Sequence, residues 1–341
     1  MGLNSAWMHA TLNRRRFAAS AGAALAVNFV RSPARAAQFA YKYGNDQTQG
    51  SPVTVRAVQM WKTIERETGG RLVVETFPDS TLGGDTQMLA QLRSGALQFL
   101  TEVGSILGNV VPAAQITDIA YAFKDARQAF AATDGELGEY VRKEVAAKGM
   151  YMIPRPFDNG FREITANRPV RNAAELEGLK IRVPASAAFV DLFKTLGAAP
   201  APMNVSELYT SLQTHVVEAQ ENALINIEQS KIFEVQKTLN FSNHAWSCWW
   251  FLANQDAWQA LGPEIQAIVT RNVAKYAALQ RRDFANLTAS LTDKLRRQGL
   301  TVYACDVASL KARLPPYYAK WRALYGDRAW SLLEKYAGKL A

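Results

Sequence analysis

The chain has 341 residues, of which 48% are hydrophobic and 20% are charged. This apolar content excludes a disordered chain, and two cysteines are too few for a small disulfide scaffold. At roughly 150 residues per domain, the length indicates two domains.

The net charge of +9 is concentrated near the N-terminus. Residues 1–36 contain no acidic residue and five arginines: Arg14, Arg15, Arg16, Arg31 and Arg35. Without those five, 34 basic side chains face 30 acidic ones, and the remaining +4 is spread along the chain. A basic surface for nucleic acid is therefore not expected.

The same 36 residues have the order of a secretory signal peptide. A charged segment, Asn13 to Ala19, overlaps a mildly apolar stretch, Ala18 to Val30, and Ala34-Arg35-Ala36 forms a small-residue cleavage site. The apolar stretch is shorter than the roughly 20 residues that span a bilayer. Paired arginines before Phe17 indicate a twin-arginine signal, with an ordinary Sec leader as the alternative. Both predict a mature protein in the periplasm.

From residue 37 onward, the sequence predicts strands that alternate with helices. Ser51 and Pro52 have the pattern of an N-cap and first helical residue. The expected strands are 39–44, 71–77, 96–102, 151–156, 161–167 and 179–183. The expected helices are 53–68, 85–94, 135–148, 186–196, 206–213 and 263–298. This order predicts an α/β architecture with mainly parallel sheets, in which a ligand lies beyond the carboxyl ends of the strands.

The last of these helices, 263–298, is unusually long. Unbroken, it would measure about 54 Å at 1.5 Å per residue, which is enough to bridge two domains. The alternative is a pair of helices with a kink near Arg281 and Arg282.

Few residues beyond position 36 are suited to catalysis or metal binding. The only histidines there are His215 and His244, and the common metal, nucleotide and nucleophile motifs are missing. We therefore expect no cofactor, no metal and no catalytic residue. His244 and Cys248 lie about 13 Å apart if their segment is a strand, which is too far for a catalytic dyad. Cys248 and Cys305 are expected to be buried thiols rather than a disulfide.

Two other groups of residues suggest a binding cleft. In a strand, Trp246 and Trp250 would share one face and Trp249 the other, so one face could line a cleft, with plain core packing as the alternative. Arg162 and Arg182 lie on expected strands among apolar residues, where a buried guanidinium needs an anion. From the residues alone, that anion is an internal Asp or Glu by default and a ligand carboxylate otherwise.

Four motifs follow one another in the middle of the chain: G-F-R-E-I-T-A-N-R-P-V from 160, E-L-E-G-L-K-I-R-V-P from 175, A-P-M-N-V-S-E-L-Y-T-S-L-Q-T from 201, and Q-E-N from 220. With segments 81–97 and 111–123, they resemble the DctP-type solute-binding proteins of tripartite ATP-independent periplasmic (TRAP) transporters. The likeness covers nearly the whole chain after residue 36.

The resemblance implies a two-lobed α/β periplasmic binding protein of the type II-like class, with crossing hinge strands and a long lobe-bridging helix. We expect lobe I to comprise 37–159 plus about 248–287. Lobe II would then comprise about 160–247 plus 288–341.

The resemblance also implies the ligand contacts. The family's main carboxylate-binding arginine corresponds to Arg182, its second binding arginine to Arg162, and its binding-site asparagine to Asn222. The remaining expected contacts are strand-end or cleft residues: Asp46, Gln47, Glu102, Ser105, Val205, Trp246 and Trp249. Val205 and Ser105 differ from the residues of sialic-acid-binding members, so that ligand is not expected.

Two ligand classes remain open, a hydroxylated monocarboxylate such as a sugar acid and an aromatic or branched 2-oxo acid. Dicarboxylates rank third, because the motifs hold no further positive residue. The expected function is capture of a small organic acid and its delivery to TRAP membrane permease subunits, without catalysis. The alternatives are a ligand sensor that signals to a membrane receptor, or a secreted hydrolase or lyase that uses Glu102, Glu218 or Glu221.

Overall fold

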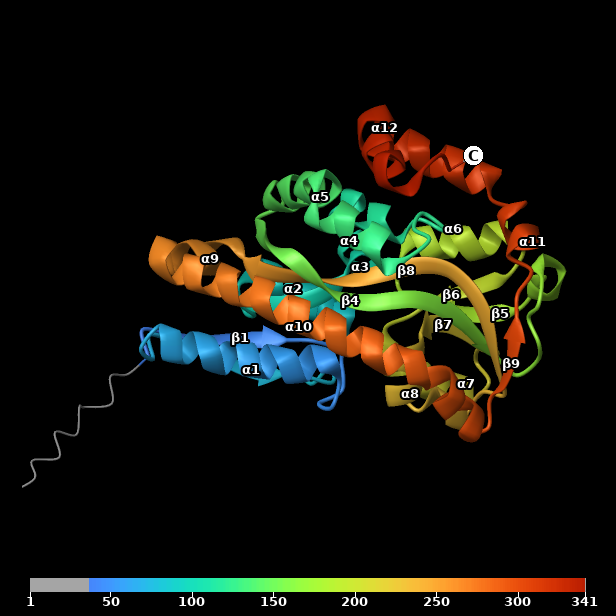
Figure 1. Ribbon diagram of the computed structural model, residues 1–341, viewed down its shortest axis with the longest axis horizontal. Coiled ribbons are helices and arrows are strands. Elements are labelled where there is room, and N and C mark those ends of the chain that lie inside the picture. The colour runs from blue at the N-terminus through green and yellow to red at the C-terminus, as the bar shows by residue number, and fades with distance from the viewer. Residues whose placement is uncertain (1–36, 341) are drawn as a thin grey trace, which may run out of the picture. The chain divides into compact units, whose positions relative to one another are not determined.

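A mixed nine-stranded sheet forms the centre of residues 37–340, the part of the chain that this computed structural model describes (Figure 1). The strand order is β2-β1-β3-β8-β4-β7-β5-β6, and β9 pairs with β8. The strands are β1 (Phe39–Gly44), β2 (Leu72–Phe77), β3 (Phe99–Val103), β4 (Met150–Ala166), β5 (Lys180–Val183), β6 (Ala199–Pro202), β7 (Ala219–Ala223), β8 (Thr238–Asn254) and β9 (Thr301–Ala304). The signal peptide and cleavage site predicted for residues 1–36 lie outside the described residues.

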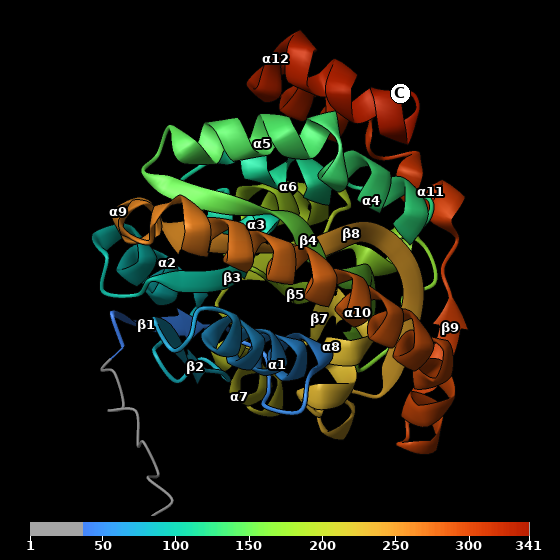
Figure 2. The ribbon, with the colours of Figure 1, turned by 60° about the vertical axis from the view of Figure 1, so that its left-hand side comes forward.

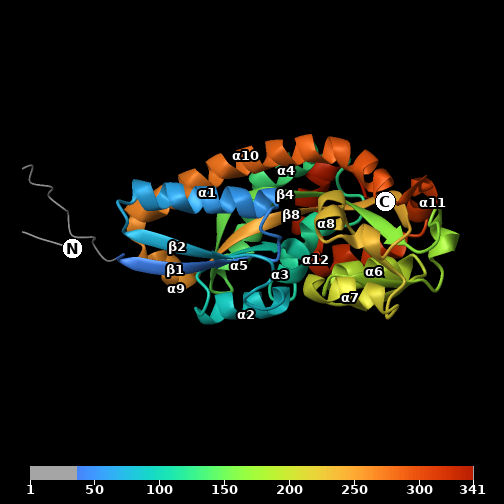
Figure 3. The same cartoon turned by 90° about the horizontal axis from the view of Figure 1, so that it is seen from below.

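Helices lie on both sides of the sheet (Figure 3). They are α1 (Pro52–Glu67), α2 (Asp85–Ser94), α3 (Gly104–Leu107), α4 (Ala126–Asp134), α5 (Glu136–Ala146), α6 (Ala187–Thr195), α7 (Leu208–Gln213), α8 (Leu224–Gln229), α9 (Gln255–Ala260), α10 (Gly262–Arg297), α11 (Val307–Lys311) and α12 (Pro315–Ala337). Short 3-10 turns include η1 (Pro112–Asp118) and η3 (Val205–Glu207). Within residues 37–340, no helix has both the length and the apolar character that a membrane span needs.

The first helix shows why the local sequence signals were informative. Ser51 Oγ accepts a hydrogen bond from Thr54 N at 3.2 Å, and Pro52 occupies the first helical position. This arrangement satisfies a backbone donor that the helix itself leaves unpaired, so α1 begins where the sequence predicted. All six expected helices are present.

Strand direction differs from the prediction. The parallel pairs are β1–β2, β1–β3, β5–β6, β5–β7 and β8–β9, whereas β3–β8, β4–β7 and β4–β8 are antiparallel. The prediction of mainly parallel sheets is therefore wrong for the centre of the fold. Direction depends on which strands become neighbours, and no local signal reports this.

Two strands of 17 residues, β4 and β8, connect the two ends of the sheet. Near its C-terminal end β8 pairs with β3, and β4 pairs with β7 near its own C-terminal end. The separate strands expected at 151–156 and 161–167 are one strand, because β4 stays paired through three register shifts. Such bulges bend a strand without ending it. These are the crossing strands that the resemblance implied.

Helix α10 is a single helix of 36 residues that lies along β4 (Figure 2). Arg56 on α1 pairs with Asp283 at 2.5 Å, and Glu228 on α8 pairs with Lys294 at 2.6 Å. Helix α10 therefore contacts both α1, which is expected in lobe I, and α8, which is expected in lobe II. The alternative with a kink near 281 is wrong. The side chain of Arg281 instead donates hydrogen bonds to Asp134 from an intact helix.

The C-terminal helix α12 packs on helices that precede and follow β4 in the chain. Lys335 pairs with Glu136 on α5 at 2.7 Å, and Lys320 pairs with Asp191 on α6 at 2.6 Å. Figure 1 shows α12 alongside these helices at one side of the fold. The proposed lobe bounds stay a prediction.

Candidate ligand-binding site

A narrow pocket lies where several strands end. Asp46 and Gln47 follow β1, Val103 ends β3, Pro184 follows β5 and Asn222 lies near the end of β7. Seven of the ten residues singled out from the sequence line it: Asp46, Gln47, Arg162, Arg182, Val205, Asn222 and Trp249. The free space is about 30 Å³, enough for water molecules but too small for an organic acid of several carbons.

Arg182 on β5 supplies a buried positive charge to this pocket. Its side chain is 2% exposed, and its Nε and Nη2 donate to Met203 O at 3.1 and 2.7 Å. No carboxylate among residues 37–340 forms an ion pair with it. Burial lowers the pKa of the guanidinium to about 10, which still leaves it charged at neutral pH. Such a charge is suited to receive an anion.

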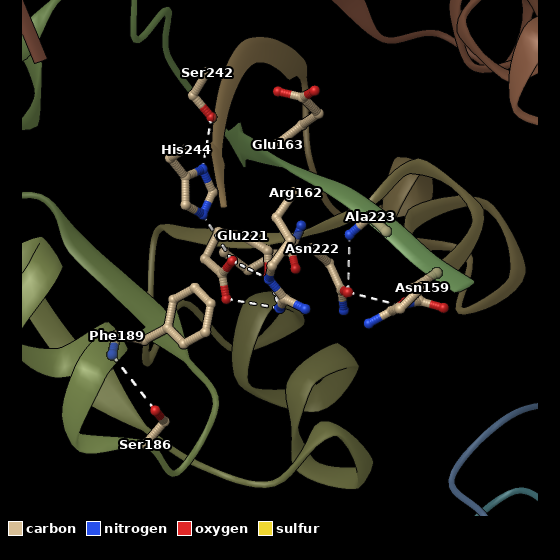
Figure 4. A network of polar contacts seen from close by, with 12 residues as sticks. Asn159, Arg162, Glu163, Ser186, Phe189, Glu221, Asn222, Ala223, Ser242 and His244 are labelled. Atoms are coloured by element: carbon tan, nitrogen blue, oxygen red, sulfur yellow. Dashed lines mark hydrogen bonds and ion pairs between the residues drawn. The ribbon is translucent and has the colours of Figure 1, made fainter. Parts of the chain in front are cut away.

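Arg162 on β4 has an internal partner. Its Nε donates to Glu221 Oε2 at 2.5 Å and its Nη2 to Glu221 Oε1 at 2.8 Å, which forms a bidentate pair (Figure 4). The guanidinium also lies 5.1 Å from the ring centre of Phe189. The default expectation of an internal salt bridge is therefore confirmed for Arg162 and wrong for Arg182.

The pair continues to a histidine. His244 Nε2 lies 2.9 Å from Glu221 Oε2, and its Nδ1 lies 2.8 Å from Ser242 Oγ (Figure 4). Burial lowers the pKa of His244, so its neutral ring donates through Nε2 and accepts from the hydroxyl. Burial alone would raise the pKa of Glu221, but Arg162 and His244 outweigh it and hold that pKa below its ordinary value. Glu221 is thus an ionised counter-charge.

Asn222 presents an amide donor to the pocket. Its Oδ1 accepts from Ala223 N at 2.9 Å and from Asn226 Nδ2 at 2.7 Å. The same Asn226 Nδ2 donates to Asn159 Oδ1 at 2.9 Å. These bonds orient the amide of Asn222, and no acceptor among residues 37–340 takes a hydrogen bond from its Nδ2.

Three carboxyl groups influence one another at this pocket. Asp46 and Asp85 line it together with Arg182, and Glu102 is buried outside its walls with Oε2 unpaired among the described residues. Burial raises the pKa of all three, and repulsion from Asp85 raises those of Asp46 and Glu102 further. A carboxyl group that keeps its proton can both donate to and accept from a hydroxyl.

Three residues expected in the site do not line the pocket. Trp246 is 1% exposed, donates from Nε1 to Asp158 Oδ1 at 3.1 Å, and packs edge-on against Phe123. Trp246 therefore belongs to the core, which was the alternative expectation for the tryptophans of this strand. Glu102 and Ser105 are also fully buried outside the walls.

Comparison with known proteins decides the family. Residues 43–323 match the DctP family, described as bacterial extracellular solute-binding protein, family 7. This chain belongs to that family. It is a periplasmic TRAP-type solute-binding protein and not an enzyme.

Individual DctP relatives share about a third of their residues with it. Uncharacterized protein y4mM of Sinorhizobium fredii is 35% identical over 84% of this chain, which spans only 53% of that relative. The 2,3-diketo-L-gulonate-binding periplasmic protein YiaO of Escherichia coli is 29% identical, over 76% of this chain and 80% of its own length. A TRAP periplasmic solute-binding protein from Polaromonas, solved with D-erythronate, is 28% identical, with a TM-score of 0.84 over 89% of this chain and 99% of its own.

Several pocket residues of this DctP protein escaped the sequence analysis. Asp85 is the most important, because it adds a carboxylate beside Arg182. The sequence did contain a signal for Asp85, because this acid begins α2 directly after two glycines that follow a strand.

Within residues 37–340, no group of three or more His, Cys, Asp or Glu side chains is arranged to hold a metal ion. Cys248 and Cys305 are free thiols, as expected, but only Cys248 is fully buried, and Cys305 is partly exposed.

Proposed function

We propose that this protein captures a polyhydroxylated monocarboxylate, a sugar acid, and delivers it to TRAP membrane permease subunits. The observation that carries the proposal is Arg182, a buried guanidinium without a carboxylate partner among residues 37–340. In a water-poor pocket, a carboxylate that meets this fork gains two charge-assisted hydrogen bonds. Asn222 adds a fixed donor beside it.

The rest of the pocket favours hydroxyl groups over a hydrocarbon body. Asp46, Gln47 and Asp85 line the pocket and present acceptors and donors to it. Two relatives bind such molecules, because the Escherichia coli protein is named for 2,3-diketo-L-gulonate and the Polaromonas structure holds D-erythronate. Both acids carry one carboxylate and several oxygens.

The other ligand classes fit less well. A dicarboxylate would place its second negative charge near Asp46 and Asp85. Arg162 is not free to neutralise that charge, because it already pairs with Glu221. An aromatic or branched 2-oxo acid is the second candidate, because Trp249 lines one wall of the pocket. A wall of one tryptophan leaves the polar groups opposite without partners, which is costly for an apolar ligand.

Entry of any of these acids requires the pocket to open. Polar contacts around it include Thr48 to Gln229 at 2.9 Å, Asn109 to Ala185 O at 2.7 Å, and Thr86 to Asn204 through N and Oγ1, both at 3.3 Å. We place the hinge where β4 and β8 slip in register, between Asp158 and Gly160. This position supports lobe I as 37–159 plus about 248–287, and lobe II as about 160–247 plus 288–341. Separation of the lobes along these bounds also has to break contacts away from the pocket, such as Ser186 Oγ to Gln115 Oε1 at 2.8 Å and Lys335 to Glu136 at 2.7 Å.

A thermal-shift panel tests the ligand class. It contains D-erythronate, 2,3-diketo-L-gulonate and D-galacturonate, with phenylpyruvate and succinate as the other acid classes and D-galactose as the neutral match of D-galacturonate. A ligand at 100 times its dissociation constant stabilises the native state by about 2.7 kcal/mol. We expect the largest rise in Tm with a sugar acid and none with D-galactose. A response to D-galactose alone would rule out the carboxylate site.

Delivery and export need separate tests. We expect loss of sugar-acid uptake when the gene is deleted. Normal uptake with loss of a transcriptional response would favour the ligand sensor.

We further propose that residues 1–36 are a twin-arginine signal peptide cleaved after Ala36. Replacing Arg14, Arg15 and Arg16 with lysine should then leave the protein in the cytoplasm, whereas a Sec leader would still export it.

A further inference from the structure

An asparagine beside the pocket reaches the first turn of a distant helix. Asn204 directly precedes η3 and the pocket residue Val205. Its Oδ1 accepts hydrogen bonds from Thr86 N and Thr86 Oγ1 on α2, both at 3.3 Å. Thr86 and Asn204 are 118 positions apart, and the lobe bounds proposed above put them in different lobes. This contact therefore forms only when the two lobes meet.

Helix α2 has no side-chain cap of its own. Its N-cap residue is Gly84, which has no side chain to accept a hydrogen bond. The amides of Gln87 and Met88 both donate to Gly84 O at 2.9 Å. The amide of Thr86 is one of the first four in the helix, which find no carbonyl partner within it. Asn204 thus supplies the acceptor that a Ser, Thr, Asp or Asn at the N-cap normally provides.

The local structure on both sides favours this approach. A Cβ on Gly84 would lie 3.0 Å from Asn204 Cγ and 3.1 Å from its Nδ2, so glycine leaves room for the asparagine. The φ of Gly84 is −66°, which any residue adopts, and close approach is therefore the reason for glycine here. Asn204 is itself the N-cap residue of η3, yet its side chain makes no capping bond there. Its oxygen is directed to α2 instead.

The residue before Asn204 is held by the ligand-site arginine. Arg182 Nε and Nη2 donate to Met203 O at 3.1 and 2.7 Å, and Met203 N donates to Val183 O at 3.1 Å. These bonds fix Met203 on β5. A guanidinium has five N–H groups, so three remain for a ligand carboxylate, and Nη1 makes no hydrogen bond within residues 37–340. Arg182 can therefore hold a ligand and Met203 at the same time.

We propose that Asn204 is a positioning residue that keeps the pocket closed over the bound acid by capping α2 from the other lobe. The inference rests on the proposed capture of an acid at Arg182. The carboxylate orders Arg182, Arg182 fixes Met203, and Asn204 then binds α2, whose first residue, Asp85, lines the pocket. Val205 N also donates to Asp85 Oδ2 at 3.4 Å. Because these contacts form after the acid has entered, they slow its release and not its entry.

Stopped-flow tryptophan fluorescence measures both steps, with Trp249 in the pocket wall as the reporter. The probe is the acid of the thermal-shift panel that gives the largest rise in Tm. Two long hydrogen bonds that exist only in the closed state extend the lifetime of the complex about fivefold. Asn204→Ala should therefore raise the dissociation rate constant about fivefold and leave the association rate constant within about twofold of wild type. Asn204 is only half-buried, so its truncation does not threaten folding.

A double-mutant cycle tests the contact itself. Thr86→Val removes the hydroxyl donor but keeps the shape and the amide, and it should raise the dissociation rate constant about twofold. In the Asn204→Ala background, Thr86→Val should have no further effect, because the shared acceptor is already gone. Equal effects of Thr86→Val in both backgrounds would show that the two residues act independently, and would overturn the proposal.

Ser206→Ala is the matched control. Ser206 is exposed on the same segment, and its side chain makes no hydrogen bond within residues 37–340. This variant should release the acid at the wild-type rate. Release as fast as that of Asn204→Ala would assign the effect to the segment as a whole and not to the cap.

Amide hydrogen exchange gives a second, site-specific readout. The acid should slow exchange of the Thr86 amide in the wild-type protein, and this added protection should disappear in Asn204→Ala. The Met88 amide, which is bonded within the helix, should stay equally protected in both proteins. Wild-type release or wild-type protection of Thr86 in Asn204→Ala overturns the cap while leaving the carboxylate site intact. Absence of a response to every acid of the panel overturns both.

Discussion

Replacing Arg182 with methionine should separate ligand binding from folding. The variant loses a buried charge and two hydrogen bonds to Met203 O, while the unbranched methionine fills much of the same space. No carboxylate among residues 37–340 forms an ion pair with Arg182, so the change breaks no salt bridge. Its charge does lower the pKa values of Asp85 and Asp46, so both pKa values should rise in the variant.

Two opposing contributions set the effect on stability. Burial lowers the pKa of Arg182 from 12.5 to about 10, which corresponds to roughly 3 kcal/mol against the charged form in the folded chain. Methionine removes that penalty. The Met203 carbonyl loses its donors, which costs about 1–3 kcal/mol. We therefore expect the free energy of unfolding to change by no more than about 2 kcal/mol in either direction.

The effect on binding should be much larger. A ligand carboxylate in a closed pocket without its cation loses about 2–5 kcal/mol, or roughly thirtyfold to several thousandfold in affinity. Calorimetry with the sugar acid measures this loss, and urea unfolding followed by circular dichroism measures stability.

Arg162→Met is the contrast. It leaves Glu221 buried with only His244 beside it, and removal of one partner from a buried pair typically costs about 3–5 kcal/mol. The reasoning fails if Arg182→Met is destabilised as much as Arg162→Met, or if it binds the acid within threefold of the wild-type affinity.

Gly160→Ala should destabilise the packing of β4 on α10 by about 1–3 kcal/mol in thermal unfolding, because φ is +89° and the new Cβ would lie 2.7 Å from Phe284 Cε1. An unchanged Tm would contradict this. Burial raises the pKa of Glu163 to about 8, so its contribution to stability is complete below its unfolded pKa and is lost as pH rises through about 8. Glu163→Gln should therefore flatten the decline in unfolding free energy between pH 5 and pH 7 by up to roughly 1.4 kcal/mol per pH unit in urea titrations. Equal slopes in the two proteins would show that this carboxyl ionises normally. Cys248 and Cys305 should react slowly with a thiol reagent in the native protein, because burial raises the pKa of both, and both should react after unfolding without reductant. Fewer than two reactive thiols would reveal a disulfide.

The sequence by itself determined features that depend on a few consecutive residues. Ser51 and Pro52 predicted the start of α1, and the apolar spacing of 263–298 predicted an unbroken α10. Arg182 and Arg162 stood out because a charged residue interrupts an apolar strand. In each case, the signal lies within one element, so reading along the chain was sufficient.

Only the tertiary structure decided which residues meet. Arg162 and Glu221 are 59 positions apart, and their pairing makes Arg182 the arginine without an internal carboxylate partner among residues 37–340. Likewise, only the tertiary structure shows that Asp85 lines the pocket and that Trp246 packs in the core instead. Register shifts between β4 and β8, and the order in which strands become neighbours, set the direction of each side chain. These are properties of pairing between distant segments, and a one-dimensional pattern does not contain them.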